Sequence, residues 1–225
     1  MGQMGNPMVE WRGTDLSETG FFQGAYIRVG KTNLMIYADM FQHHIREING
    51  YEIGLRTETK IRYHKIIFQV KKEQKDATND VVYAPLVVLG FQKKDGIKLE
   101  HQYDQKTWRT QVKYQFVTTG EKEIHQSHGL DFRFHIYQQH YRLELDWMGA
   151  MIDHFDSRVY FWDVNLPGEM LTRMISHSSH SQGVKILFNI SNASKLGLKI
   201  RVNYLDLSFN SNVDISGGLF IQAAL

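Results

Sequence analysis

The sequence predicts an all-β protein, a single antiparallel β-sandwich with one short connecting helix. Apolar and polar residues alternate with a period of two along several segments, which is typical of β-strands. Turn-forming residues separate these segments, and no helical repeat lies between them. The chain has 225 residues, which is enough to bury a core without disulfides or metals.

The clearest alternation occurs in four segments, at residues 108–116, 130–136, 143–147 and 198–204. Because consecutive side chains of a strand point to opposite faces, we expect each segment to bury its apolar residues and expose its polar residues. Trp147 is therefore predicted to lie in the core, and Glu144 and Asp146 are predicted to face outward. Further strands are predicted at residues 25–29, 34–38, 61–70, 81–91, 97–103, 158–164, 184–190 and 219–222.

Turn and helix signals complete the predicted outline. Residues 93–96, Lys-Lys-Asp-Gly, lie between two apolar runs and predict a hairpin turn. Residues 168–175 carry apolar side chains on one helical stripe and predict the short connecting helix. No proline- or serine-rich linker interrupts the chain. Residues 21–225 are therefore predicted to form one domain, preceded by an N-terminal extension or first strand at residues 1–20.

Composition and charge argue against several classes of protein. The 26 basic and 24 acidic residues are scattered along the chain, which argues against a nucleic-acid binder. Cysteine is absent, so disulfide scaffolds, thiol catalysis and cysteine-based metal sites are excluded. No segment approaches the ~18 consecutive apolar residues of a membrane-spanning helix, and we expect no membrane insertion. The N-terminus lacks the basic and apolar regions of a secretory signal, so we expect either that a signal has been removed or that export follows another route, such as virion assembly or cell lysis.

Two carboxylates form the first candidate catalytic pair. Glu144 and Asp146 lie two residues apart, so on a strand they share a face, as the paired carboxylates of glycoside hydrolases do. The run resembles the start of the glutamate–aspartate–glutamate signature of concanavalin-like β-jelly-roll glucanases. Met148 and Gly149 occupy the positions where the closing glutamate, the acid/base of that family, would fall. The resemblance implies catalytic roles for Glu144 and Asp146, without the complete set of the family.

A second candidate catalytic pair lies earlier in the chain. Residues 55–60, Leu-Arg-Thr-Glu-Thr-Lys, are similar to the arginine–serine/threonine–glutamate–leucine–arginine strand of jelly-roll alginate lyases. This resemblance implies Arg56 and Glu58 as the catalytic candidates of a polysaccharide lyase. The glutamine–isoleucine–histidine strand of that family is replaced here by Leu-Gly-Phe-Gln at residues 89–92, and no tyrosine/lysine strand follows Val184.

The C-terminal part of the chain carries a likeness of fold. Residues 184–191, 192–197 and 199–208 look like the closing strands of concanavalin-like lectin and glucanase sandwiches, whose last long strand ends in a tyrosine–aspartate–leucine stretch. This resemblance implies a sandwich of the concanavalin-like jelly-roll type.

Aromatic residues are abundant, with 4 Trp, 11 Tyr and 13 Phe. Sugar rings stack on tryptophan and tyrosine, while carboxylates and guanidinium groups fix the sugar hydroxyls. Two clusters near turns are predicted to bind a ligand: Tyr103, Trp108 and Arg109, and Arg158, Tyr160, Trp162 and Asp163. Trp108 and Trp162 are the predicted stacking platforms. The open alternative is that alternate aromatic residues fill the core of the sandwich.

Metal sites have little support in the sequence. Asp153 and Asp156 are weak calcium candidates, because their oxygens suit calcium but their spacing lacks the glycine of a dedicated calcium loop. The histidine pairs lack the His-Glu-x-x-His pattern of a zinc site. We expect no metal or other cofactor, with calcium as the one candidate.

The leading functional hypothesis is non-catalytic carbohydrate binding by a lectin-like domain. Such a domain could belong to a phage tail or baseplate component that recognises a host cell-surface polysaccharide, which makes an extracellular or virion-associated location the expectation. The expected partners are a polysaccharide or glycan and, through homo-oligomers or virion assembly, other protein chains. The first alternative is a polysaccharide lyase or glycoside hydrolase that uses Arg56, Glu58, Glu144 or Asp146. The second is a structural virion protein that binds only protein partners.

Overall fold

The structure is a computed structural model that describes residues 3–4, 8–10, 18–43, 48–75, 92–120, 123–154, 157–162, 172–190, 194–204 and 213–222. Its regular elements within these ranges are fifteen β-strands. In chain order they are β1 Gln3–Met4, β2 Met8–Glu10, β3 Glu18–Val29, β4 Thr32–His43, β5 Ile48–Ile61, β6 His64–Lys75, β7 Gln92–Asp104, β8 Trp108–Thr119, β9 His125–Tyr137, β10 Tyr141–Ile152, β11 Val159–Trp162, β12 Thr172–Ile175, β13 Ser179–Asn189, β14 Lys195–Tyr204 and β15 Val213–Gln222. Within the described ranges, no helix has the length and apolarity needed to cross a membrane.

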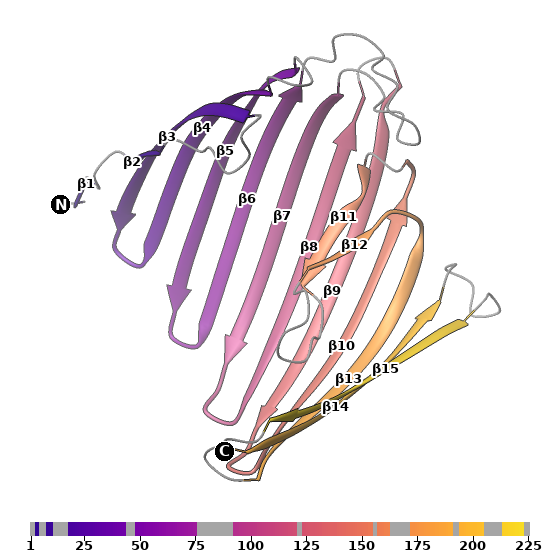
Figure 1. The fold of residues 1–225 in the computed structure, drawn as a ribbon. Coiled ribbons are helices and arrows are strands. Elements are labelled where there is room, and N and C mark those ends of the chain that lie inside the picture. The colour runs from indigo at the N-terminus through magenta and orange to yellow at the C-terminus, as the bar shows by residue number, and fades with distance from the viewer. Residues whose placement is uncertain are drawn as a thin grey trace. The chain divides into compact units, whose positions relative to one another are not determined.

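The sheet topology confirms the all-β, antiparallel part of the prediction. Thirteen strands form one sheet in the order β1-β3-β4-β5-β6-β7-β8-β9-β10-β13-β14-β15, with β2 also beside β3, and β11 and β12 form a separate two-stranded ribbon (Figure 1). Strands adjacent in the sheet are therefore almost always adjacent in the sequence. A jelly roll instead needs Greek-key connections, in which a later strand returns beside an earlier one. The jelly-roll part of the prediction is not confirmed.

The predicted connecting helix is wrong where the structure describes it. Residues 172–175 form β12, which pairs in antiparallel register with β11, for example Ile175 with Val159. This pairing supplies the backbone hydrogen bonds that a helix would have made and buries both of these side chains. The rest of the predicted helix, residues 168–171, lies outside the described residues.

The predicted hairpin turn at residues 93–96 is also wrong, because Asp95 and Gly96 lie inside β7. Lys93 is held in the strand by its carbonyl, which accepts a hydrogen bond of 3.1 Å from the backbone N–H of Gly120. The turn comes instead at residues 105–107, between β7 and β8. An Asp-Gly pair permits a tight turn but does not require one when a partner strand is available.

The connections between consecutive strands of the large sheet fall into two series. After β3, β5, β7, β9 and β13 they contain 2, 2, 3, 3 and 5 residues. After β4, β6, β8, β10 and β14 they contain 4, 16, 5, 26 and 8 residues. Consecutive antiparallel strands run in opposite directions, so the two series leave from opposite strand ends. We call these the short-turn ends and the long-connection ends.

The chain divides into two compact units that are described separately. Unit 1 comprises Met1–Ile61, Ile66–Leu99 and Val117–His125. Within it, β3, β4 and β5 pair residue by residue, and Tyr37 of β4 lies opposite Gly24 and Gly54. The ring of Tyr37 lies over Gly54, since a Cβ at position 54 would be 2.2 Å from its Cζ, and its hydroxyl donates a 2.8 Å hydrogen bond to Glu52.

Unit 2 comprises Arg62–Lys65, Glu100–Phe116 and Gln126–Leu225. Within it, β9, β10, β13, β14 and β15 pair in that order in continuous antiparallel register (Figure 1). The ribbon of β11 and β12 also belongs to this unit. Rows of residues that lie opposite one another can therefore be followed across the five strands from β9 to β15.

The close contact between Tyr37 and Gly54 gives a stability prediction. In Gly54→Ala the new methyl group must displace the ring of Tyr37, so we expect a loss of about 1–3 kcal/mol, the usual cost of overpacking. Gly217→Ala is the matched control, because its Cβ would meet nothing closer than a carbonyl oxygen of Lys199 at 3.5 Å. Denaturant titration of both variants measures the difference. Equal stability of the two variants would contradict the packing described for Tyr37.

Candidate functional site

The sheet of unit 2 has two chemically different faces. Because side chains alternate along each strand, the register places one set of residues together on what we call the polar face: Asp131, Arg133, His135, Glu144, Asp146, Ser181, Gly183, Lys185, Arg201 and Asn203. The other set forms the apolar face: Leu130, Phe132, Phe134, Ile136, Leu143, Leu145, Trp147, Val184, Ile186, Phe188, Leu198, Ile200 and Val202.

Burial on the two faces is the reverse of that in a water-soluble sandwich. On the polar face, Glu144, Asp146 and Arg201 are 4%, 5% and 3% exposed. On the apolar face, Leu145, Val184 and Ile200 are 37%, 41% and 48% exposed. The prediction that Glu144 and Asp146 face outward while Trp147 lies in the core is therefore wrong, since Trp147 is exposed. The period of two is confirmed, but the environments predicted for the two faces are wrong.

The central feature of the polar face is an ion pair that reaches across a strand. Asp146 of β10 lies opposite Gly183 of β13, and Gly183 lies opposite Arg201 of β14. Arg201 Nη2 is 2.8 Å from Asp146 Oδ2, and Arg201 Nη1 donates a 2.9 Å hydrogen bond to Ser181 Oγ. A Cβ at position 183 would lie 2.0 Å from Asp146 Oδ1. Only glycine leaves space for this pair to form over β13.

A second group of charges occupies the next row toward the short-turn end. Glu144 lies between His135 and Lys185 in the register. Its Oε2 is 2.7 Å from Lys185 Nζ, 3.6 Å from His135 Nδ1 and 3.7 Å from Arg142 Nη2. The carboxylate is thus surrounded by nitrogen groups from three strands. The surrounding positive groups stabilise this buried carboxylate.

A third pair lies within β9, where Arg133 Nε is 3.1 Å from Asp131 Oδ2. Asp131, Arg133, Glu144, Asp146, Lys185 and Arg201 together carry three negative and three positive charges. Buried charges are tolerated when they are paired in this way. The polar face therefore carries a dense network of buried ion pairs.

The ribbon of β11 and β12 packs on this polar face. Lys113 Nζ and Gln115 Nε2 of β8 both donate hydrogen bonds to the backbone carbonyl of Tyr160, the first at 3.0 Å. Gly129 has its absent side chain on the same side of β9 as Asp131, and a Cβ there would lie 2.6 Å from Phe161 Cζ. The ribbon thus covers the part of the polar face where β8 and β9 carry Lys113, Gln115 and Gly129.

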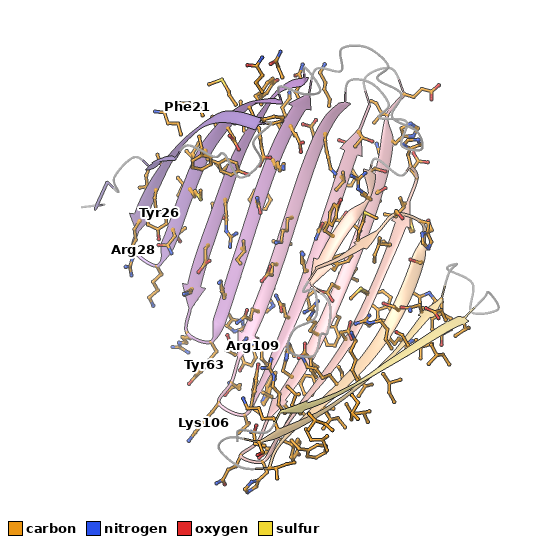
Figure 2. All side chains as sticks on the ribbon, in the orientation of Figure 1. Phe21, Tyr26, Arg28, Tyr63, Lys106 and Arg109 are labelled. Atoms are coloured by element: carbon orange, nitrogen blue, oxygen red, sulfur yellow. The ribbon has the colours of Figure 1, made fainter. Side chains whose placement is uncertain are left out.

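Aromatic side chains gather at the short-turn ends of unit 2. The ring of Tyr103 lies 5.1 Å from that of Trp108 and 4.7 Å from that of His64, and the ring of Trp108 lies 6.1 Å from that of Phe134. Figure 2 shows Tyr63 at the turn between β5 and β6, which is one of the short turns. The rings of His64, Tyr103, Trp108 and Phe134 form what we call the first aromatic band. Phe134 belongs to the apolar face.

A second aromatic band lies toward the long-connection ends. Tyr114 Oη is 2.8 Å from His128 Nδ1, and the rings of Phe116 and His128 lie 4.8 Å apart. The rings of His180 and Tyr204 stack at 4.3 Å. Trp108 and Phe116 are eight residues apart on β8, which corresponds to about 26 Å along the strand.

The predicted ligand-binding residues fall into two groups in unit 2. In the first, Tyr103 and Trp108 are neighbours, while Arg109 forms a hydrogen-bonded ion pair with Asp104. In the second, Arg158 Nε donates a 2.7 Å hydrogen bond to Tyr160 Oη. Trp162 is the last residue of β11 and Asp163 lies outside the described residues. The prediction that these groups bind a sugar stays a prediction.

The predicted catalytic residues form one pair in each unit. Arg56 and Glu58 share a strand of unit 1 with their charged groups 3.8 Å apart, and Lys60 lies 3.4 Å from Glu58. Glu144 and Asp146 are buried in the ion-pair network of unit 2. Asp153 is exposed and Asp156 lies outside the described residues, and no group of three or more metal-binding side chains occurs in the described ranges.

The residues that the sequence did not single out are Asp131, Arg133, Gly183, Lys185 and Arg201. Asp131, Arg133 and Arg201 lie in alternating segments, so the period of two marks their face, whereas Gly183 and Lys185 do not lie in such a segment. The pairing of Asp146 with Arg201, which are 55 residues apart, depends on the strand register. Gly183 indicates an ion pair across β13 only when the register that places it between Asp146 and Arg201 is known.

The buried ion pair gives the second stability prediction. Asp146→Asn leaves the guanidinium of Arg201 buried without its carboxylate, so we expect a loss of about 3–5 kcal/mol. The matched control is Glu58→Gln, which removes a carboxylate from a partly exposed pair and should cost about 0–1 kcal/mol. Denaturant titration measures both values. Similar losses in the two variants would contradict a special role of the Asp146–Arg201 pair.

Comparisons with known proteins bear on the fold. No family model matches the chain, and no curated protein matches it. The siderophore receptor PirA from Acinetobacter baumannii aligns with a TM-score of 0.56 and 11% identity over 100% of this chain and 41% of that chain. CdiB from Acinetobacter baumannii aligns with a TM-score of 0.38 and 9% identity over 92% of this chain and 51% of that chain, a likeness too low to carry an argument. The chain thus spans about two fifths of PirA and half of CdiB, and it shares a general fold with PirA.

Proposed function

We propose that the chain is a membrane-spanning β-sheet protein whose apolar face contacts lipid and whose polar face lines a passage for polar solutes. The single observation that carries the proposal is the inverted burial of unit 2, with charges buried on one face and large apolar side chains exposed on the other. Sheets that span outer membranes alternate in this sense, apolar toward lipid and polar toward the interior.

The energetics of the apolar face favour a lipid environment. Leu145, Val184 and Ile200 form one continuous cross-strand row, and all three are exposed. Because each of these side chains exposes 37–48% of its surface, removing the rest from water would gain roughly 0.6–1.4 kcal/mol, the matching fraction of the gain on full burial. A contiguous apolar surface of this kind marks a surface that contacts another apolar phase. Hydrocarbon chains of a bilayer provide that phase without any further folding of the chain.

Strand length and the aromatic bands support the same proposal. The strands from β8 to β10 have 12 to 13 residues and those from β13 to β15 have 10 to 11, against about 9–11 needed to cross a bilayer. Trp108 and Phe116, which mark the two aromatic bands on β8, are eight residues apart, close to the roughly 9–11 residues of a tilted strand that crosses a bilayer. Aromatic rings with a polar edge favour the two interfaces between lipid and water.

The alternation of connection lengths gives further support. In outer-membrane sheets one end of the strands carries short turns and the other carries longer loops. Here the short-turn ends carry 2 to 5 residues, and the long-connection ends carry up to 26. We therefore propose an outer-membrane location, with the long connections on the outer side. This location reverses the expectation from the sequence that the chain does not insert into a membrane.

The likeness to the siderophore receptor PirA supports the fold alone, because it rests on 11% identity and covers 41% of that chain. In lipid, backbone groups must all be paired, so membrane-spanning sheets close into barrels. The proposal therefore requires a partner for the edge of β15, which within the described residues pairs only with β14. That partner is another segment of polypeptide, from the same chain or from a second one.

Membrane insertion is the first test of the proposal. The purified chain, diluted from urea into liposomes, should float with the vesicles in a density gradient and should stay with them after washing at alkaline pH. The matched control is the same dilution without vesicles, in which the exposed apolar face should cause aggregation. A chain that folds to a soluble monomer and leaves the vesicles at alkaline pH would overturn the proposal and favour the carbohydrate-binding hypothesis.

The proposal also predicts how charge is tolerated on the apolar face. Val184→Lys places a charge in the middle of the exposed row, and in a bilayer it should cost about 2–4 kcal/mol of folding free energy. Ile190→Lys is the matched control, because Ile190 is an exposed residue in the turn after β13 and should cost about 0–1 kcal/mol. Folding titrations in liposomes measure both. Equal, small costs would indicate that Val184 faces water, where exposed substitutions stay within about 0.5 kcal/mol.

A further inference from the structure

The ribbon of β11 and β12 lies within the longest connection of the sheet, between β10 and β13. A connection of 26 residues could extend away from the strands into solvent. Its described part instead packs on the polar face of unit 2 (Figure 1). The contacts that hold it there are of three kinds: backbone hydrogen bonds, apolar packing, and anchors where the connection leaves β10 and enters β13.

The hydrogen bonds join the ribbon to side chains of β8. The backbone carbonyl of Tyr160 accepts bonds from Lys113 and Gln115, and the backbone N–H of Tyr160 donates to Gln115 Oε1 at 3.3 Å. The backbone N–H and the backbone carbonyl of Tyr160 are thus both hydrogen-bonded to side chains of β8. The ammonium group of Lys113 also lies 5.2 Å from the centre of the ring of Phe161.

The apolar packing is formed on a part of the polar face that carries small side chains. Val159 and Phe161 are fully buried, and a Cβ on Gly129 would meet both of them, at 2.9 and 2.6 Å. Ala150 lies opposite Gly129 in the register and is also buried. Glycine and alanine at these two positions leave space on the sheet for the rings and methyl groups of the ribbon.

The anchors hold both legs of the connection. Ser157 Oγ lies 2.6 Å from Ser127 Oγ of β9, and both residues are fully buried. The backbone N–H of Ile152 donates to Ser178 Oγ at 3.0 Å, which joins the end of β10 to the residue before β13. The described part of the connection is therefore fixed to the sheet at its start, along β11 and at its end.

We propose that the ribbon is a fixed constriction of the passage along the polar face, and that Arg158 and Tyr160 are the groups that a passing solute meets. Val159 and Phe161 point into the sheet, so the alternate residues Arg158 and Tyr160 point away from it, and the ring of Tyr160 is exposed. The guanidinium of Arg158 is positioned by its 2.7 Å bond to the hydroxyl of Tyr160. The ribbon sets the size limit for solutes, and Arg158 favours anionic ones. This inference rests on the proposed function.

The test is solute entry into liposomes that contain the full chain, with flotation of the same vesicles measuring insertion. Phe161→Ser removes the buried ring and should raise the entry of larger neutral sugars severalfold, because the ribbon loses its packing on Gly129. Ile190→Ser is the control, since it also replaces an apolar side chain by serine but lies outside the ribbon, exposed in the turn after β13. Its entry rates for neutral sugars should stay close to those of the unmodified chain.

A second pair of variants tests the fixed position and the charge. The chain contains no cysteine, so Ser127→Cys combined with Ser157→Cys allows a single disulfide between β9 and the ribbon. A fixed constriction predicts equal entry before and after reduction of this disulfide, and faster entry after reduction would overturn it in favour of a movable gate. Arg158→Glu should shift the preference of entry from a small anion toward a small cation, measured as a change in reversal potential across a planar bilayer.

The outcomes separate this inference from the proposed function. If neither the unmodified chain nor any variant inserts or admits solutes, the proposed function fails. If all insert and Phe161→Ser admits sugars at the rate of the unmodified chain, only the constriction is overturned. If the reversal potential of Arg158→Glu equals that of the unmodified chain, the role assigned to Arg158 is overturned.

Discussion

The constraint on which the rest of the structure depends is that buried charges must be paired. Asp146 and Arg201 lie on strands that are not neighbours, and their ion pair exists because Gly183 leaves the space between them empty. The pair fixes the register of β10, β13 and β14. If β10 or β14 slipped by one residue, Asp146 and Arg201 would lie on opposite faces of the sheet and could not pair. Burial of the polar face in turn leaves the apolar residues of the same strands on the exposed side.

This division explains features that a water-soluble sandwich would leave unexplained. An exposed apolar face needs an apolar surrounding, and aromatic rings near both ends of the strands suit its two boundaries. Among the described residues of unit 2, the buried apolar side chains are Met148, Ala150, Val159, Phe161 and Ile175, from β10 and the β11–β12 ribbon. The apolar core of this unit is thus small, and it serves to attach a connection to the polar face.

The sequence predicted the strands better than it predicted their surroundings. The period of two located most of β8, β9, β10 and β14, because alternation follows directly from strand geometry. Periodicity does not say which face is buried, so Trp147 was placed in the core and Glu144 on the surface. The turn signal at Asp95-Gly96 was overridden by strand pairing, and the helical stripe at residues 172–175 was overridden by pairing with β11. The row that joins Asp146 to Arg201 depends on pairing between distant segments, which a single sequence does not specify.

The measurement that tests the account most directly is a spin-label scan along β13, in a chain that offers no competing cysteine. Single cysteines at the even positions from Gln182 to Phe188 would carry a nitroxide on the apolar face, in vesicles prepared with the folded chain. The account predicts that lipid-soluble oxygen reaches these labels readily and that a water-soluble nickel complex does not, with the label at Ile190 showing the opposite balance. Ready access of the nickel complex to Val184 and Ile186 would contradict the account, because it would place the apolar face in water.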